Sequence, residues 1–173
     1  MLSAVGLVAL LTAGACGSNP GPSVRSDDAA ATIASAYSLP ADQEACLEKA
    51  FRSHPAATRP LASDQPATDL DLLALGAVED GCIQVSTLAQ AITSGASDSF
   101  GTLDEQQRTC LDDAVTALSD DDRVTLLVGL VVPRSLGDTW GIELGRVTNG
   151  ILDACQLSVT DLAGPTVPTV PAP

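Results

Sequence analysis

The sequence predicts an all-α fold, made of two disulfide-stapled αα-hairpin repeats with additional short helices. Three observations lead to this prediction. No run of residues alternates with a period of two for long enough to suggest a sheet. Apolar residues recur at helical spacing behind residues that cap helix N-termini. Finally, SLPADQEACLEKAF at residues 38–51 aligns without gaps on TLDEQQRTCLDDAV at residues 102–115, with a cysteine at the same place in each.

Each copy of this repeat is predicted to begin a helix. In the second copy, Thr102 and Glu105 have the spacing of a capping box, and negative charge lies at the positive end of the helix. In the first copy, Ser38 is predicted to cap the helix, and Pro40 falls in the first turn, where its missing N–H does no harm. One face of the second helix carries the apolar residues Leu103, Cys110, Leu111, Val115 and Leu118.

Each copy leads to a second helix that ends in a cysteine. Thr68 with Asp71 opens the first of these closing helices, which carries Leu72, Leu75 and Cys82 along one face. The other closing helix has apolar residues at steps of four, three, four and four: Trp140, Leu144, Val147, Ile151 and Cys155.

Two further helices are predicted between these. Ser86 caps a short one that runs through Leu88 and Ile92. Ser119 with Asp122 caps another, which extends from about residue 120 to 132 until Pro133 stops it.

The N-terminus carries an uncharged apolar run, LSAVGLVALLTAGA, at residues 2–15. It is too short to span a membrane and has the length of the apolar part of a secretory signal. The small residues Ala13, Gly14 and Ala15 stand directly before Cys16, and this segment resembles a bacterial lipobox. The resemblance implies that residues 1–15 are a lipoprotein signal peptide and that Cys16 is the lipid attachment site. An ordinary secretory signal cut at A-x-A is the alternative.

The remaining cysteines are predicted to form disulfides. With Cys16 set aside, the even number left suits an exported chain with a disulfide framework. In each repeat the two cysteines fall on the inward faces of two joined helices, which favours the pairs Cys46–Cys82 and Cys110–Cys155. The two other pairings stay open. A four-cysteine metal site is disfavoured, because its ligands usually come as close pairs.

The expected organisation has four parts. After the signal peptide comes a flexible tether over residues 16–37, rich in Gly, Pro, Ser and Ala. The helical domain covers residues 38–162, with repeat one at about 38–94 and repeat two at about 102–162. Residues 163–173 form a Pro/Thr-rich tail, which we expect to be disordered.

Composition excludes several classes of function. The chain has 173 residues, 22 acidic and 8 basic side chains, and a formal charge of −14. Nucleic-acid binding depends on Lys and Arg neutralising phosphates, so no nucleic-acid partner is expected. Adsorption to anionic lipid through a basic face is excluded for the same reason. An apolar content of 45% is too high for a wholly disordered acidic tail.

No catalytic, cofactor-binding or metal-binding residue is predicted. His54 is the only histidine, no motif marks a nucleophile beside it, and it is interpreted as a solvated loop residue. The acidic clusters at residues 104–105, 112–113 and 120–122 are interpreted as helix caps and solvated helix faces, because no calcium-loop pattern occurs.

The sequence therefore favours a non-catalytic, acidic binding module, attached to the outer face of a bacterial membrane through lipid on Cys16. Its expected partner is a basic envelope or extracellular protein. The alternatives are an inhibitor of a cationic envelope-active enzyme, such as a muramidase, and an envelope hydrolase that uses His54 or a carboxylate pair. The mature region also resembles uncharacterised Cys-containing helical proteins exported by high-GC Gram-positive bacteria, which implies no particular activity.

Overall fold

The computed structural model describes residues 24–62, 67–132 and 136–157, and every regular element within these ranges is helical. This confirms the predicted all-α class. The elements are α1 (Ser26–Tyr37), α2 (Ala41–Ser53), the 3-10 helix η1 (Pro55–Leu61), α3 (Asp69–Cys82), α4 (Val85–Phe100), α5 (Glu105–Thr116), α6 (Asp120–Val131) and α7 (Asp138–Ala154).

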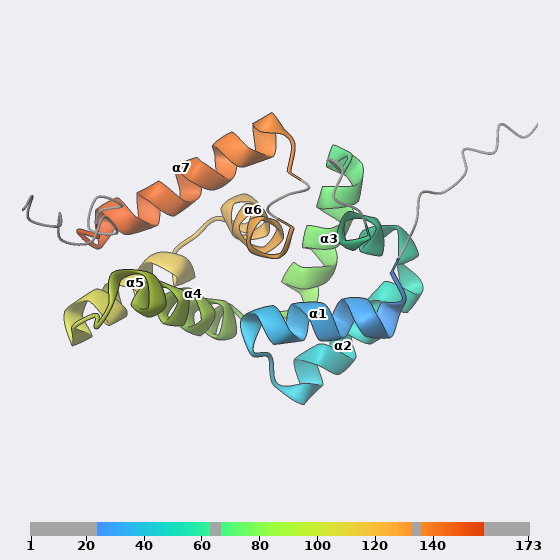
Figure 1. The fold of residues 1–173 in the computed structure, drawn as a ribbon, viewed down its shortest axis with the longest axis horizontal. Helices are drawn as coiled ribbons and strands as arrows, with labels where there is room; N and C mark the ends of the chain where they lie inside the picture. Colours follow the sequence, from blue (N-terminus) through green and yellow to red (C-terminus); the bar gives the residue numbers. More distant parts are fainter. Residues whose placement is uncertain (1–23, 63–66, 133–135, 158–173) are drawn as a thin grey trace, which may run out of the picture.

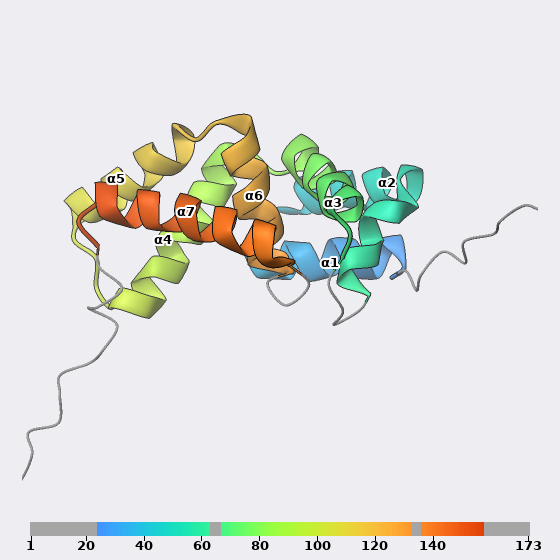
Figure 2. The same cartoon turned by 90° about the horizontal axis from the view of Figure 1, so that it is seen from above.

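The helices form two units of the same design. In the first unit, α1 packs against α2, while α3 packs against η1 and α2. In the second unit, α4 packs against α5, while α7 packs against α6 and α5. The two units lie at opposite ends of the long axis and meet where α3 packs against α6 (Figures 1 and 2). Each unit therefore begins one helix earlier than the predicted repeats at 38–94 and 102–162.

Helix α1 is a correction to the predicted tether. Residues 16–37 were expected to be a flexible linker, but Ser26–Tyr37 is helical and buries both Ile33 and Tyr37. Alanines fill most of the remaining inward face, and their small side chains let α1 lie close to α2 while giving little hydrophobic periodicity. The predicted signal peptide at residues 1–15, the predicted lipid attachment site Cys16 and the predicted tail at residues 163–173 lie outside the described residues.

In both units the first two helices are joined through a residue with positive φ. Ser38 caps the C-terminus of α1 with φ of 53°, and its N–H donates to the carbonyl oxygen of Ala34. Gly101 follows α4 with φ of 81°, a conformation that glycine adopts without a steric penalty.

Two of the predicted helix starts are confirmed by their side-chain caps. Thr68 precedes α3, and its hydroxyl oxygen accepts from the backbone N–H of Asp71 at 3.2 Å. Ser119 precedes α6 and accepts from the backbone N–H of Asp122 at 3.2 Å. In both cases the hydroxyl satisfies one of the helix N–H groups that lack a partner within the helix.

Three other predicted starts are displaced. Helix α5 is capped by Asp104 rather than Thr102, and Asp104 forms a capping box with Gln107 in place of the predicted Glu105. A carboxylate at the N-cap can accept the same bond as a hydroxyl and also favours the helix dipole. Helix α2 follows Pro40, since Ser38 belongs to the end of α1. Helix α4 follows Gln84 rather than Ser86 and continues to Phe100.

The predicted disulfide pairing is confirmed. Cys46 on α2 is bonded to Cys82 on α3, and Cys110 on α5 is bonded to Cys155 at the end of α7. The Cα atoms of both pairs are 5.6 Å apart, an ordinary separation for a disulfide. Each bond joins the second helix of a unit to its last helix, so the two units are closed in the same way.

Helix α6 is packed closely on both sides. A Cβ atom on Gly76 of α3 would overlap the side chain of Val124, and one on Gly129 of α6 would overlap Leu144 of α7. Arg123 of α6 also forms an ion pair with Asp80 of α3, across the junction of the units. These contacts hold α3, α6 and α7 closely together where they meet.

Candidate functional site

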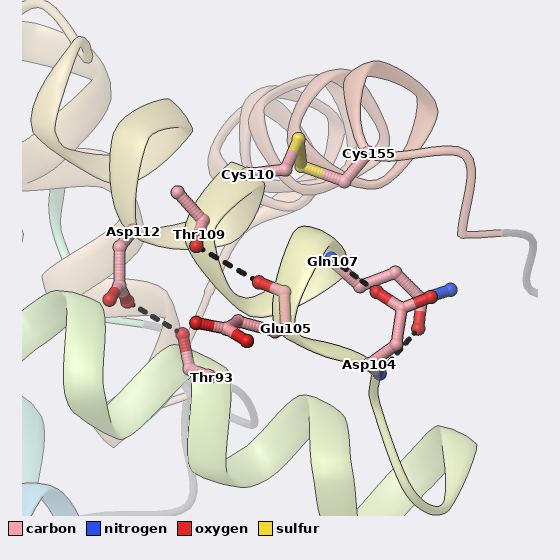
Figure 3. The surroundings of a disulfide bond; sticks show 8 residues. All are labelled: Thr93, Asp104, Glu105, Gln107, Thr109, Cys110, Asp112 and Cys155. Atoms are coloured by element: carbon pink, nitrogen blue, oxygen red, sulfur yellow. Dashed lines mark hydrogen bonds between the residues drawn. A yellow bond between two sulfur atoms is a disulfide. The ribbon is translucent and has the colours of Figure 1, made fainter.

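The acidic clusters do not converge on one site. Asp104 caps α5, and Asp112 on the same helix accepts from the hydroxyl of Thr93 on α4 at 2.9 Å (Figure 3). Asp122 accepts from Ser119 at the start of α6 and forms an ion pair with Arg146 of α7. These hydrogen bonds place Asp104 and Asp122 at helix N-termini and Asp112 on a helix face, as interpreted from the sequence. Two pairs of carboxylates do share a hollow: Glu105 with Asp113 on α5, and Asp121 with Glu143 between α6 and α7.

His54 is exposed at the C-terminus of α2. It lines a shallow hollow of about 330 Å³ together with Ala50, Ala74, Ala77, Val78, Gly81 and Cys82. Neither a carboxylate nor a hydroxyl side chain lines this hollow, so His54 has no orienting acid and no nucleophile there. Within the described ranges, no group of three His, Cys, Asp or Glu side chains is placed to hold a metal ion.

An apolar groove lies at the junction of the two units, between α3, α6 and α7. Its volume is about 350 Å³. Leu73 of α3 lies in the groove with 52% of its surface exposed, and Leu70, one turn earlier, is 78% exposed. The lining residues are Leu73, Ala77, Asp121, Val124, Thr125, Thr139, Trp140 and Glu143.

Trp140 connects the two sides of this groove. Its indole N–H donates to the carboxylate of Asp69 on α3 at 3.2 Å, while its ring packs partly against the core. A large aromatic side chain with its polar edge satisfied and part of its surface accessible is typical of positions that bind partners.

Carboxylates surround the apolar lining. Asp121 is exposed, and among the described residues its carboxylate forms no ion pair and accepts no hydrogen bond. Glu143 lies across the groove and is paired with Arg146, whose guanidinium also contacts Asp122. That hydrogen bond from Arg146, with a second from Ser119, holds the pKa of Asp122 below its usual range. Asp122 therefore stays ionised at neutral pH.

Glu79 is a separate and unexpected feature of α3. Its side chain is completely buried, and neither carboxylate oxygen has a hydrogen-bond partner in the described part of the chain. Burial raises the pKa of Glu79 to about 8. Because this pKa lies above 7, Glu79 is protonated at neutral pH. Nearby, the buried hydroxyl of Tyr37 donates to the carbonyl oxygen of Leu127 at 2.6 Å. The pKa of Tyr37 is raised mainly by burial, and also by the negative charge that Glu79 carries when ionised.

Sequence reasoning missed both the groove and Glu79, although each left a signal. The segment DLDLL puts Leu70 and Leu73 outside the face defined by Leu72 and Leu75, which indicates an apolar surface that the core does not use. Glu79 lies four residues after Leu75 and three before Cys82, on the face that was predicted to point inward.

Comparison with other proteins adds no further identification. The sequence matches no protein-family model, and no curated protein or solved structure matches it. Among the described helices, none alone is both long and apolar enough to cross a bilayer; α3 and α4 together meet the length and composition criteria but are bent by 107°.

Proposed function

We propose that this chain is a lipid-anchored, non-catalytic binding module at the outer face of a bacterial membrane, and that its acidic surface binds a basic protein. The observation that carries the proposal is the imbalance of surface charge. Five described arginines are already paired with carboxylates. The acidic side chains that form no ion pair among the described residues, apart from buried Glu79, are Asp42, Glu44, Asp69, Asp98, Asp104, Glu105, Asp112, Asp113, Asp121, Asp138 and Asp153.

Two features of the chain support export and membrane anchoring: the disulfides and the segment that resembles a lipobox. The two disulfides are consistent with an exported protein, because structural disulfides persist in oxidising compartments. The lipobox resemblance at residues 13–16 supplies the anchor, and lipoproteins of this kind carry more than the single acyl chain that binds only marginally. The negative charge would hold the helical units off an anionic bilayer and attract a cationic partner.

Cell fractionation tests the anchor. Wild-type chain should be found with the membrane, whereas Cys16→Ala should appear in the medium, because the variant lacks the sulfur that takes the lipid. Ser18→Ala, two residues away, is the matched control and should stay with the membrane. Retention of the Cys16→Ala protein on membranes would refute lipid attachment at this residue.

Crosslinking in intact cells followed by co-purification tests the binding. The captured partner should have a high isoelectric point. Without the crosslinker it should dissociate at about 0.5 M salt, where the Debye length shrinks to about 4 Å. Inhibition of a cationic envelope enzyme, such as a muramidase, is a narrower form of the same proposal. Capture of acidic partners alone, or of a complex that is insensitive to salt, would contradict the proposal that the acidic surface binds a basic protein.

A further inference from the structure

We infer that the groove between α3, α6 and α7 is the docking site for this partner, and that it binds a cationic peptide segment with an apolar anchor side chain. This inference rests on the proposed function and specifies both the site and the chemistry of the ligand. Binding hot spots typically combine a buried apolar anchor with a polar rim, and the groove offers the receptor half of that arrangement.

The apolar half of the site is already formed. Leu73, Ala77 and Val124 provide aliphatic surface, and the Trp140 ring faces them from α7. Helix α6 is fixed against its neighbours by the close approaches at Gly76 and Gly129, and α3 is tied to α7 by the bond between Asp69 and Trp140. A groove whose walls are preformed requires little ordering when a ligand binds.

The charged half selects the occupant. Asp121 and Glu143 line the groove, and Asp69 lies at its edge through its bond to Trp140. A second copy of the chain carries a charge of −14 and would be repelled. The chain's own segments 17–23 and 158–173 contain no Lys or Arg, so they have no charge to match the rim. Complementarity therefore favours a Lys- or Arg-containing segment of another protein.

Trp140 provides a local readout, because it is the only tryptophan in the chain. The test uses the full chain in zwitterionic phosphatidylcholine vesicles, titrated with a short amphipathic peptide of Leu and Lys. Two control peptides have the same length, one with every Lys replaced by Gln and one with every Leu replaced by Ser. We expect the Leu/Lys peptide to shift the Trp140 emission and to bind at least about ten-fold more tightly than either control, a difference of about 1.4 kcal/mol.

Matched variants locate the site. Leu73→Asp should weaken binding of the Leu/Lys peptide by about ten-fold or more, while Leu130→Asp should leave it unchanged. Leu130 is a fair control because it is 44% exposed, close to the 52% of Leu73, and does not line the groove. Asp121→Asn combined with Glu143→Gln should weaken binding and reduce its salt dependence, whereas Asp98→Asn on α4 should change neither.

Each contrary outcome contradicts a different claim. Peptide binding without a change in Trp140 emission, or equal losses in Leu73→Asp and Leu130→Asp, would reject the groove and leave the proposed acidic binding function intact. Failure of any cationic peptide to bind would reject both. A concentration-dependent emission shift in the absence of peptide would show that the groove joins two copies of the chain, and would overturn the inference.

Discussion

The wild-type protein should lose stability as the pH rises from about 5 to about 9, and the variant Glu79→Gln should lose much less. The folded-state pKa of Glu79 is about 8, above the ordinary value of 4.5. The folded chain therefore keeps a proton that the unfolded chain releases. This contribution to stability is complete below about pH 4.5 and is lost as the pH rises to about 8 and beyond. The total loss is about 5 kcal/mol, since one pKa unit corresponds to about 1.4 kcal/mol.

Urea denaturation at a series of pH values measures this effect. At pH 8, Glu79→Gln should be more stable than wild type by a few kcal/mol, because its amide stays neutral and the burial of a charge is avoided. Glu105→Gln is the matched control, since Glu105 is exposed, and should leave the pH dependence unchanged. A wild-type stability that is flat from pH 5 to 9 would show that Glu79 is not buried as the structure has it.

The repeat suggests a second substitution at this position. Aligned on the cysteines, Glu79 corresponds to Leu152, which packs partly against the core in the second unit. Glu79→Leu should therefore be at least as stable as Glu79→Gln at every pH, because no polar group is left without a partner. If Glu79→Leu is more stable than wild type, the packing of α3 does not explain why a carboxyl group stands at position 79.

Removing either disulfide should lower the free energy of unfolding by about 4 kcal/mol. In the chain-entropy model, the stabilisation depends on the length of the closed loop, and the separations of 36 and 45 residues give nearly equal values. The paired variants Cys46→Ala/Cys82→Ala and Cys110→Ala/Cys155→Ala test the two bonds separately, without leaving a free thiol behind. Because domains of this size are stable by only about 5–15 kcal/mol, the chain without both bonds should lose a large part of its stability, about 8 kcal/mol.

The two paired variants should resemble each other, since the bonds close equivalent helices in the two units. Urea denaturation of each variant gives the loss, and non-reducing peptide mapping of the wild type should link residue 46 to 82 and residue 110 to 155. If the free energy of unfolding fell by less than about 1 kcal/mol in one variant, the missing bond would contribute little, and packing alone would hold its helices together.

The sequence was most informative where a structural feature depends on residues close together in the chain. Thr68 and Ser119 were found as caps because a capping hydroxyl and the N–H that it accepts from are only three residues apart. The disulfide pairing also followed from local information, since the repeat identified which cysteine belongs to which pair of helices.

The features that were missed depend on contacts between distant segments. Helix α1 has an inward face made mostly of alanine, so its sequence resembles that of a linker, and its helical packing depends on contacts with α2. The groove needs α3, α6 and α7 to meet at a particular crossing, and no pattern within one helix specifies where Leu73 lies relative to Trp140. Glu79 was overlooked because a carboxylate in an apolar helix is usually assigned to the solvent side.

Site-specific photo-crosslinking in intact cells shows whether the acid-rimmed groove binds a basic protein. A photoreactive side chain replaces Leu73 in one strain and Leu130 in another, so that both probes lie on α3 or α6 at comparable exposure. We expect a crosslinked protein rich in Lys and Arg from position 73, and none of that protein from position 130. Equal crosslinking from both positions, or crosslinking at position 73 to acidic proteins only, would contradict this expectation.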